Sequence, residues 1–353
     1  MPVPLLEALR DPAAAARLGP AEWEALLRAA RAERLHGRLA VTIAEHGLSD
    51  RVPEPARPHL RAYLALSAEH DRGVRWEVDR IAAAMRGVDA PVLLLKGAAY
   101  LMSGLPVAKG RLTGDVDILV PKARLGAVEA ALLAHGWEPT NVDPYDQMYY
   151  RRWMHELPPL RHARRHSTID VHHTILPETS RLKPDAQELI RSATPILGAP
   201  NVLVLSPRDI VLHGAAHLFH GEIAGSLRDL VDMDDLLRHF AREKAFWSGL
   251  VARAGQMDLG RPLFHTLRYA SRVLGTAVPA EALAAAEAFR PGRVTLALMD
   301  RLVPAAITPR KPGARGIASF LLYVRAHWLR MPPLLLARHL ATKGFRRFRR
   351  SPS

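Results

Sequence analysis

The 353-residue chain contains no cysteine. Disulfides, thiolate zinc sites and cysteine nucleophiles are therefore excluded, and any metal must rest on oxygen or imidazole ligands. Long apolar runs are also missing, because the nearest candidate, residues 317–340, is broken by Arg325, Arg330, Pro332 and Pro333. Residues 1–12 lack the basic start and apolar stretch of a signal peptide. These absences predict a soluble, cytoplasmic protein with no transmembrane segment.

Acidic residues are outnumbered. Lys plus Arg total 49 against 35 Asp plus Glu, which gives a net charge of +14 and an isoelectric point near 10.6. Such a surplus favours anionic partners such as nucleotides, nucleic acid or an acidic membrane surface. An Arg-rich and Ala-rich composition is the alternative source of the same surplus. Apolar residues make up 48% of the chain, enough to fill a substantial core, so a globular protein is expected.

Apolar spacing predicts a helical start, a short central sheet and a helical end. Helical periodicity covers residues 23–43 and 62–85. It resumes from residue 184 onward, interrupted by the short strand candidate at residues 202–204. A further helix is expected at residues 123–135, which end before Gly136. Apolar or alternating runs predict strands between the helical parts. We expect these strands at residues 91–95, 118–120, 145–153, 168–172 and 202–204.

Two carboxylates stand one residue apart beside an apolar run. Residues 114–120 read GDVDILV, and because side chains alternate along a strand, Asp115 and Asp117 are expected on one face. Parallel carboxylates repel each other unless a cation lies between them, and Mg²⁺ is a common answer. Asp170, in the later segment IDVH, adds a third carboxylate. Three such groups on neighbouring strands predict a two-metal cradle for phosphoryl or nucleotidyl transfer.

Basic and glycine residues upstream fit the same chemistry. Lys96 and Arg111 offer cations for phosphate charge, and Gly97 allows the backbone to approach a triphosphate closely. Each carboxylate also has an interpretation without a function. The Asp pair could belong to an ordinary surface turn, and Asp170 could be an edge-strand carboxylate that pairs with a nearby arginine. The candidates for that pairing are Arg161, Arg164 and Arg165.

The chain resembles the uncharacterised nucleotidyltransferases of the DNA polymerase β superfamily in the order of three segments. These are KGAA at residues 96–99, Arg111 followed by GDVDILV, and IDVH at residues 169–172. The resemblance extends to His213, His217 and residues 227–237, and it covers roughly residues 80–240. One departure is the upstream turn. The superfamily typically has Gly-Ser or Gly-Gly about ten residues before the Asp pair, whereas Gly97-Ala98 lies eighteen residues before Asp115. Ala98 also lacks the hydroxyl group that would bind phosphate.

The resemblance implies a small mixed β-sheet flanked by helices. Together with the helical spacing on either side of the strands, it predicts an α+β fold with an N-terminal helical layer and a C-terminal all-helical domain. It implies Mg²⁺-dependent transfer of a nucleoside monophosphate from a nucleoside triphosphate (NTP) to a hydroxyl or amine acceptor, with release of pyrophosphate. Asp115, Asp117 and Asp170 would be catalytic metal ligands for two ions, and Lys96, Gly97 and Arg111 would bind the NTP. The expected parts are a helical region 1–88, a catalytic core 89–205, a helical domain 206–342 and a basic tail 343–353.

The acceptor stays open as a small molecule, a protein or an RNA end, since a fold does not choose among them. Two other functions also stay open. One is a catalytically inactive nucleotide- or RNA-binding protein of the same fold. The other is a metal hydrolase built on His172, His213 and His217.

Two helical stretches and the tail have competing interpretations. His213 and His217 have the i, i+4 spacing of a zinc pair, but no Glu follows His213, which favours packing. Asp232 shares a helix face with Asp229, and it either takes part in pairing along the helix with Arg228 and Arg238 or orients the acceptor. The tail binds RNA or anionic lipid, or it is only a solubilising segment. Its candidate contacts are Arg346, Arg347, Arg349 and Arg350, interleaved with Phe345 and Phe348.

Overall fold

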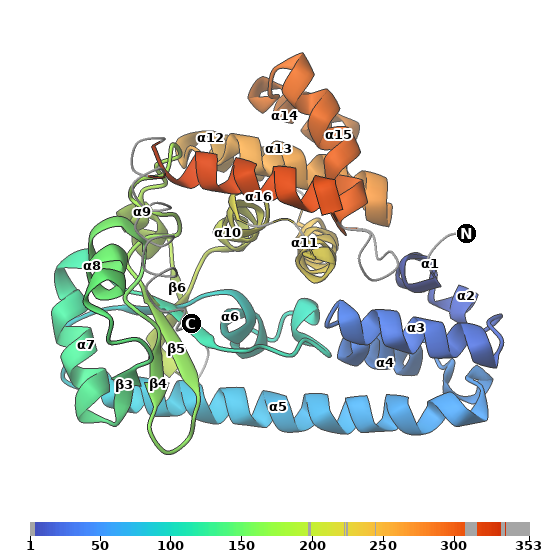
Figure 1. Ribbon diagram of the computed structural model, residues 1–353, viewed down its shortest axis with the longest axis horizontal. Coiled ribbons are helices and arrows are strands. Elements are labelled where there is room, and N and C mark those ends of the chain that lie inside the picture. Colours follow the sequence, from blue (N-terminus) through green and yellow to red (C-terminus); the bar gives the residue numbers. More distant parts are fainter. Residues whose placement is uncertain are drawn as a thin grey trace, which may run out of the picture.

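The protein has an α+β fold, as expected, in which helices surround one mixed sheet (Figure 1). The structure is a computed structural model, and it describes residues 4–196, 199–221, 223, 225–243, 245–307, 316–332 and 336. The predicted basic tail lies outside these residues. Figure 1 shows the sheet at one end of the molecule, the N-terminal helices at the other, and the later helices stacked above both.

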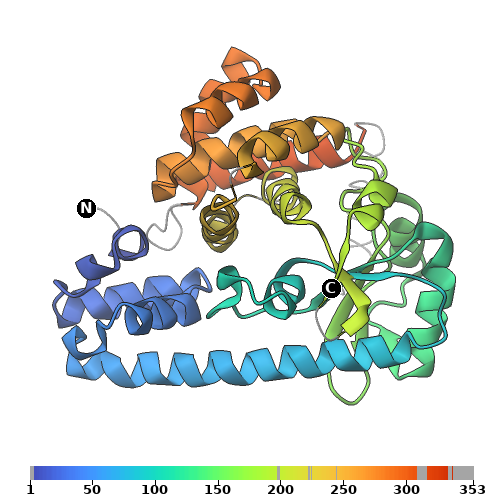
Figure 2. The ribbon, with the colours of Figure 1, turned by 180° about the vertical axis from the view of Figure 1, so that it is seen from behind.

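Five helices form the expected N-terminal layer. They are α1 (Pro4–Arg10), α2 (Pro12–Ala15), α3 (Pro20–Ala32), α4 (His36–Glu45) and α5 (Arg57–Ala84). The 28-residue α5 runs beneath the short helices and passes behind the sheet in the view of Figure 1, so that it lies in front of the strands in Figure 2. In α3 the buried side chains recur at helical spacing, at Trp23, Leu26, Leu27 and Ala30, so one face of this helix packs into the core.

The sheet has seven strands in the order β3-β4-β5-β2-β1-β7-β6. Its strands are β1 (Val92–Leu94), β2 (Val116–Leu119), β3 (Trp137–Pro139), β4 (Leu160–His162), β5 (Thr168–His172), β6 (Thr194–Ile196) and β7 (Ala199–Val204). The pairs β2–β5 and β1–β7 are parallel, and the others are antiparallel. Predicted strands at four places coincide with β1, β2, β5 and β7, while the three-residue strands β3, β4 and β6 were not predicted.

The prediction of a strand at residues 145–153 is wrong. These residues belong to α8 (Pro144–Trp153). Asp143 caps this helix by accepting hydrogen bonds from the backbone N–H groups of Tyr145 and Asp146, and Pro144 occupies the first turn, where its missing N–H costs nothing. Tyr149 packs against both Tyr145 and Trp153, one helical turn away on either side. Capping and i, i+4 aromatic contacts therefore outweigh the β-propensity of this aromatic segment.

The remaining helices flank the sheet or form the helical half. They are α6 (Lys96–Met102), α7 (Leu125–Ala134), α9 (Ala186–Arg191), α10 (Pro207–His220), α11 (Leu227–Phe240), α12 (Phe246–Gln256), α13 (Gly260–Tyr269), α14 (Ala280–Ala286), α15 (Arg293–Ile307) and α16 (Gly316–Arg330). Within the described part of the chain, no helix is long and apolar enough to cross a membrane. The helical half packs chiefly through α10, which contacts α11, α12, α13 and α16.

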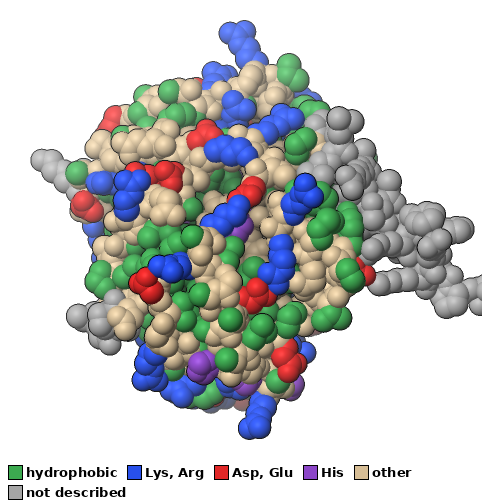
Figure 3. Space-filling view, turned by 90° about the vertical axis from the view of Figure 1, so that its left-hand side faces the viewer, with side chains coloured by type: hydrophobic (Ala, Val, Ile, Leu, Met, Phe, Trp, Pro, Cys, Tyr) green, Lys and Arg blue, Asp and Glu red, His purple; other side chains and the backbone are tan. Residues whose placement is uncertain are grey.

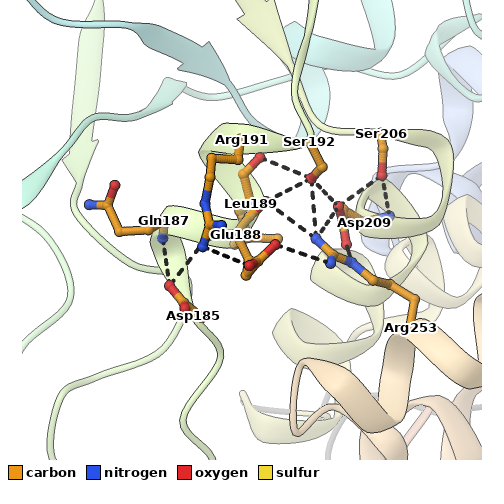
Figure 4. Close-up of polar contacts among 9 residues, drawn as sticks. All are labelled: Asp185, Gln187, Glu188, Leu189, Arg191, Ser192, Ser206, Asp209 and Arg253. Carbon is orange, nitrogen blue, oxygen red and sulfur yellow. Dashed lines mark hydrogen bonds and ion pairs between the residues drawn. The ribbon is translucent and has the colours of Figure 1, made fainter.

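A buried ion pair fastens the helical half to the sheet region (Figure 4). Asp209, in the first turn of α10, is 0% exposed and accepts hydrogen bonds from Arg253 of α12 at 2.8 and 3.0 Å. Ser192, just after α9, donates to Asp209 at 2.7 Å, and Ser206, the N-cap of α10, donates at 2.8 Å. This cluster satisfies the buried charge with donors from three elements.

His265 is a buried histidine inside the helical half. Its ring stacks on Tyr269 with centroids 5.9 Å apart, and neither ring nitrogen has a hydrogen-bond partner among the described residues. Burial, followed by the nearby Arg325, lowers the pKa of His265 from 6.5 to about 3. Below pH 6.5 the unfolded chain binds a proton at His265, whereas the folded protein does so only near pH 3. Acid therefore favours the unfolded state. The free energy of unfolding has its full His265 contribution above pH 6.5 and loses it as the pH falls toward 3.

Replacing His265 with Phe should flatten the acid side of the stability profile. The variant removes the difference in proton binding between the folded and unfolded states at this position. That difference changes the free energy of unfolding by up to about 1.4 kcal/mol per pH unit. Chemical unfolding at a series of pH values from neutral to mildly acidic measures the slope. His59→Phe, at an exposed position, is the control and should keep the wild-type slope. An unchanged slope in His265→Phe would contradict the assignment.

Candidate active site

Asp117 is the centre of a buried polar cluster near the start of β2. It is 2% exposed, and its Oδ1 accepts hydrogen bonds from Lys96 Nζ at 2.8 Å and His172 Nε2 at 2.9 Å. Burial alone would raise the pKa of Asp117, but Lys96 and His172 hold it well below its usual range. Asp117 is therefore an ionised carboxylate fixed from two sides.

The other two predicted carboxylates lie beside Asp117. Parallel pairing of β2 with β5 sets Asp117 opposite Asp170, and Asp115 immediately precedes β2. Burial, then Asp117, Glu156 and Asp115, raises the pKa of Asp170 to about 7. Burial, then Asp117, also raises the pKa of Asp115. The structure thus brings the three carboxylates close enough for each to disfavour ionisation of its neighbours.

Asp170 carries an unsatisfied oxygen. Its Oδ1 is buried and finds no hydrogen-bond donor in the part of the chain that the structure describes. The alternative pairing with an arginine is wrong for Arg165, which bonds Glu77 at 2.8 and 3.0 Å. The strand β5 is also no edge strand, since it lies between β4 and β2. A buried, partnerless carboxylate oxygen next to two other carboxylates fits a divalent cation that prefers oxygen ligands.

Lys96 and Gly97 form a tight junction where β1 passes into α6. Lys96 has a φ of +46°, a left-handed conformation that costs a non-glycine residue free energy and that is common at functional sites. Burial opposes the charge of Lys96, but Asp117 raises its pKa. A Cβ on Gly97 would lie 2.3 Å from Thr113 Oγ1 and 2.4 Å from Arg111 Nη1. The absence of a side chain at Gly97 therefore lets the loop before β2 approach α6. The predicted role of Gly97 in binding the triphosphate stays a prediction.

Gly97→Ala should disrupt the site, because the new methyl group overlaps Thr113 and Arg111. We expect about 1–3 kcal/mol lower stability, the usual cost of overpacking, together with weaker nucleotide binding. Thermal unfolding and equilibrium titration with an NTP measure the two effects. Gly114→Ala is a matched control beside Asp115, since a Cβ there meets nothing within 4 Å, and it should behave nearly as wild type. Equal behaviour of the two variants would contradict the packing role.

Arg111 reaches the helical half of the protein. Its Nε donates to Asp232 Oδ2 of α11 at 2.7 Å, and both side chains are nearly buried. Its guanidinium also lies 5.5 Å from the Tyr100 ring. Although burial opposes the charge, Asp232 raises the pKa of Arg111. Arg111 is thus held by Asp232 from across the fold. The predicted partners within α11 bond other carboxylates of that helix, Arg228 to Asp229 and Arg238 to Asp234. A role of Asp232 toward the acceptor stays a prediction.

The histidines of α10 border the same cluster. Loss of hydration among the surrounding protein atoms, then Lys96, lowers the pKa of both His213 and His217. His213 is buried, whereas part of the His217 side chain reaches solvent. His217 also interacts with Asp229, whose pKa it lowers against the effect of burial. Among the residues described, the group with metal-ligand spacing is His155, Glu156 and His172, whose ligand atoms lie within 4.8 Å of one another. The His213–His217 pair is not part of it.

Sequence reasoning missed His155 and Glu156. They follow α8, and a single antiparallel bridge pairs Glu156 with His172. Glu156 Oε2 lies 3.2 Å from His172 Nδ1, so His172 connects Glu156 to Asp117. Burial raises the pKa of Glu156. No local pattern marks these residues, because their position depends on pairing with a strand that comes later in the chain.

A mixed sheet that sets carboxylates of parallel strands side by side, next to a lysine and a helical half, agrees with the nucleotidyltransferase class that the motifs resemble. The sequence model of the family described as "Uncharacterised nucleotidyltransferase" matches residues 19–275, and the chain belongs to this family. The crystal structure of an antigenic nucleotidyltransferase-like protein from Paracoccidioides brasiliensis is 15% identical, with a TM-score of 0.31 over 60% of this chain and 95% of that one. No curated protein matches the chain.

Proposed function

We propose that the protein is a Mg²⁺-dependent nucleotidyltransferase, which moves a nucleoside monophosphate from an NTP to a hydroxyl or amine acceptor and releases pyrophosphate. The observation that carries the proposal is the partnerless, buried Oδ1 of Asp170 beside Asp117 and Asp115. Leaving such an oxygen without a partner is costly, and a cation held by all three carboxylates removes that cost.

Asp115, Asp117 and Asp170 would hold the two Mg²⁺ ions. When bound, the ions would supply Lewis acidity toward the phosphates and the acceptor. Lys96 and His172 hold Asp117 in place through its Oδ1. Lys96 also offers the cation nearest to the carboxylates for triphosphate charge. Gly97 and Thr113 keep Arg111 close to this junction while Asp232 fixes its orientation.

Asp170 is suited to a second task. A carboxylate next to the acceptor can take up its proton as a general base. In the proposed reaction the acceptor oxygen or nitrogen forms a bond to the α-phosphorus, its proton passes to Asp170, and the bond to the pyrophosphate oxygen breaks. The acceptor itself is proposed only as a class, namely a small molecule, a protein side chain or an RNA end.

The experiment is incubation of the purified protein with each labelled NTP, Mg²⁺ and a panel of small molecules, proteins and RNA, with pyrophosphate release and label transfer as readouts. We expect transfer that stops when the metal is chelated. NTP binding without metal-dependent transfer would favour the inactive nucleotide- or RNA-binding alternative. Zinc bound in the purified protein and lost in His172→Ala, together with hydrolysis instead of transfer, would favour the hydrolase alternative.

A further inference from the structure

The helix α16 exposes an unusual amount of apolar surface. Ile317 is 79% exposed and Phe320 63%, and four more large apolar side chains of the helix are also exposed, namely Leu321, Tyr323, Val324 and Trp328. Positions 317, 320, 321, 324 and 328 follow the i, i+3, i+4, i+7 spacing, so they form one stripe along the helix. Only Leu322 and Ala326 of α16 are buried. The helix lies on the near side of the helical half in Figure 1.

The same region carries most of the protein's net charge. Residues 301–353 contain twelve Lys and Arg and no Asp or Glu, so the first 300 residues have a net charge of only +2 out of +14. In keeping with this near balance, acidic and basic side chains are interspersed on the face seen in Figure 3. An Arg-rich composition would spread the surplus along the whole chain. The surplus instead lies in the segment that contains α16.

We propose that α16 and the basic sequence around it dock the protein on the surface of an anionic lipid bilayer. A helix that lies in the interface buries an apolar stripe among acyl chains while neighbouring basic residues meet the anionic headgroups. Trp328 and Tyr323 are side chains that favour the interface. The fifteen residues of α16 are too few to span a bilayer, so the contact is peripheral.

Two other occupants fit the surface less well. A second copy of the chain would bring two strongly basic segments together without an acidic counterpart, which opposes association. RNA would meet the positive charge and its bases can stack on Phe320 or Trp328, but Ile317, Leu321 and Val324 of the same stripe offer no ring. A bilayer matches the whole apolar stripe as well as the charge. This inference does not depend on the proposed enzyme activity.

The test is co-sedimentation of the full chain with phosphatidylcholine vesicles that contain or lack phosphatidylserine. We expect at least about tenfold tighter binding to the vesicles with phosphatidylserine, and weaker binding as salt rises. Ile317→Ser and Val324→Ser should each weaken the binding several-fold. Val142→Ser is the matched control, because Val142 is also 79% exposed but lies far from α16 in the sequence, and it should bind as wild type.

A charge variant separates the two contributions. Changing Arg346, Arg347, Arg349 and Arg350 together to Ser should remove most of the preference for phosphatidylserine, while circular dichroism shows an unchanged fold. Equal binding to both kinds of vesicle would overturn the proposal. So would RNA binding without vesicle binding, or a concentration-dependent dimer that Ile317→Ser abolishes in a protein that ignores vesicles.

Discussion

Asp117→Asn should reduce nucleotidyl transfer by on the order of a thousandfold or more. The amide keeps the shape of the side chain but removes the negative charge that Lys96 and His172 now stabilise at 2.8 and 2.9 Å. It also removes the most strongly ionised of the three carboxylates, because Asp117 is the one whose pKa lies below its usual range. The initial rate of pyrophosphate release at saturating NTP and Mg²⁺ measures the loss.

The fold must survive for that result to be informative. Asn can still accept a hydrogen bond from Lys96 or His172, so thermal unfolding of the variant should stay cooperative. Asp89→Asn is the matched control, since the Asp89 side chain is 92% exposed and lies outside the cluster, and it should retain full activity. Wild-type turnover in a folded Asp117→Asn protein would remove Asp117 from the site.

Asp209→Ala should lower the free energy of unfolding by about 3–5 kcal/mol. The substitution leaves Arg253 without its carboxylate partner, and it leaves Ser192 and Ser206 without their acceptor (Figure 4). Because Asp209 is 0% exposed, water cannot easily replace the lost partner. Chemical unfolding followed by circular dichroism measures the change.

A double variant distinguishes the net contribution of the ion pair to stability from the cost of leaving one buried charge without a partner. Asp209→Leu with Arg253→Met removes both charges, and it should recover much of the stability lost in Asp209→Ala. Glu24→Ala is the control for an exposed pair, since Glu24 and Arg28 are both largely exposed, and it should cost about 1 kcal/mol or less. A loss in Asp209→Ala no larger than in Glu24→Ala would contradict the anchoring role.

The strands that carry Asp117 and Asp170 could be predicted because their signals are local. The run after Asp117 is apolar, and the residues around Asp170 alternate, so β2 and β5 are recognisable without tertiary information. The strands β3, β4 and β6 have only three residues each. Their extended conformation depends more on hydrogen bonding to neighbouring strands than on their own sequence pattern. The helix α8 did have a local signal, because Asp143-Pro144 is a capping sequence that the aromatic residues after it obscured.

The partners of the site residues could not be predicted in the same way. The sequence predicts Arg111 as a phosphate ligand, a role that stays a prediction. Its bond to Asp232 could not be predicted, because it exists only where α11 returns to the loop before β2. Glu156 lies on no regular element, and only its bridge to His172 shows its place in the cluster. Gly97 was recognised as a close-approach glycine, but the groups that approach it come from Thr113 and Arg111. Residue types can indicate a chemistry, whereas partners depend on the fold.

The span of chain that builds the cluster has a consequence for protein synthesis. His172 lies 55 residues after Asp117, and Asp232 lies 121 residues after Arg111. A chain that is still on the ribosome therefore lacks β5 when β2 emerges, and it lacks α11 for longer. Because domains fold as their last elements become available, the cluster cannot assemble until more than half of the protein has been translated. If the proposed activity is correct, unfinished chains should accordingly lack it until α11 has been synthesised.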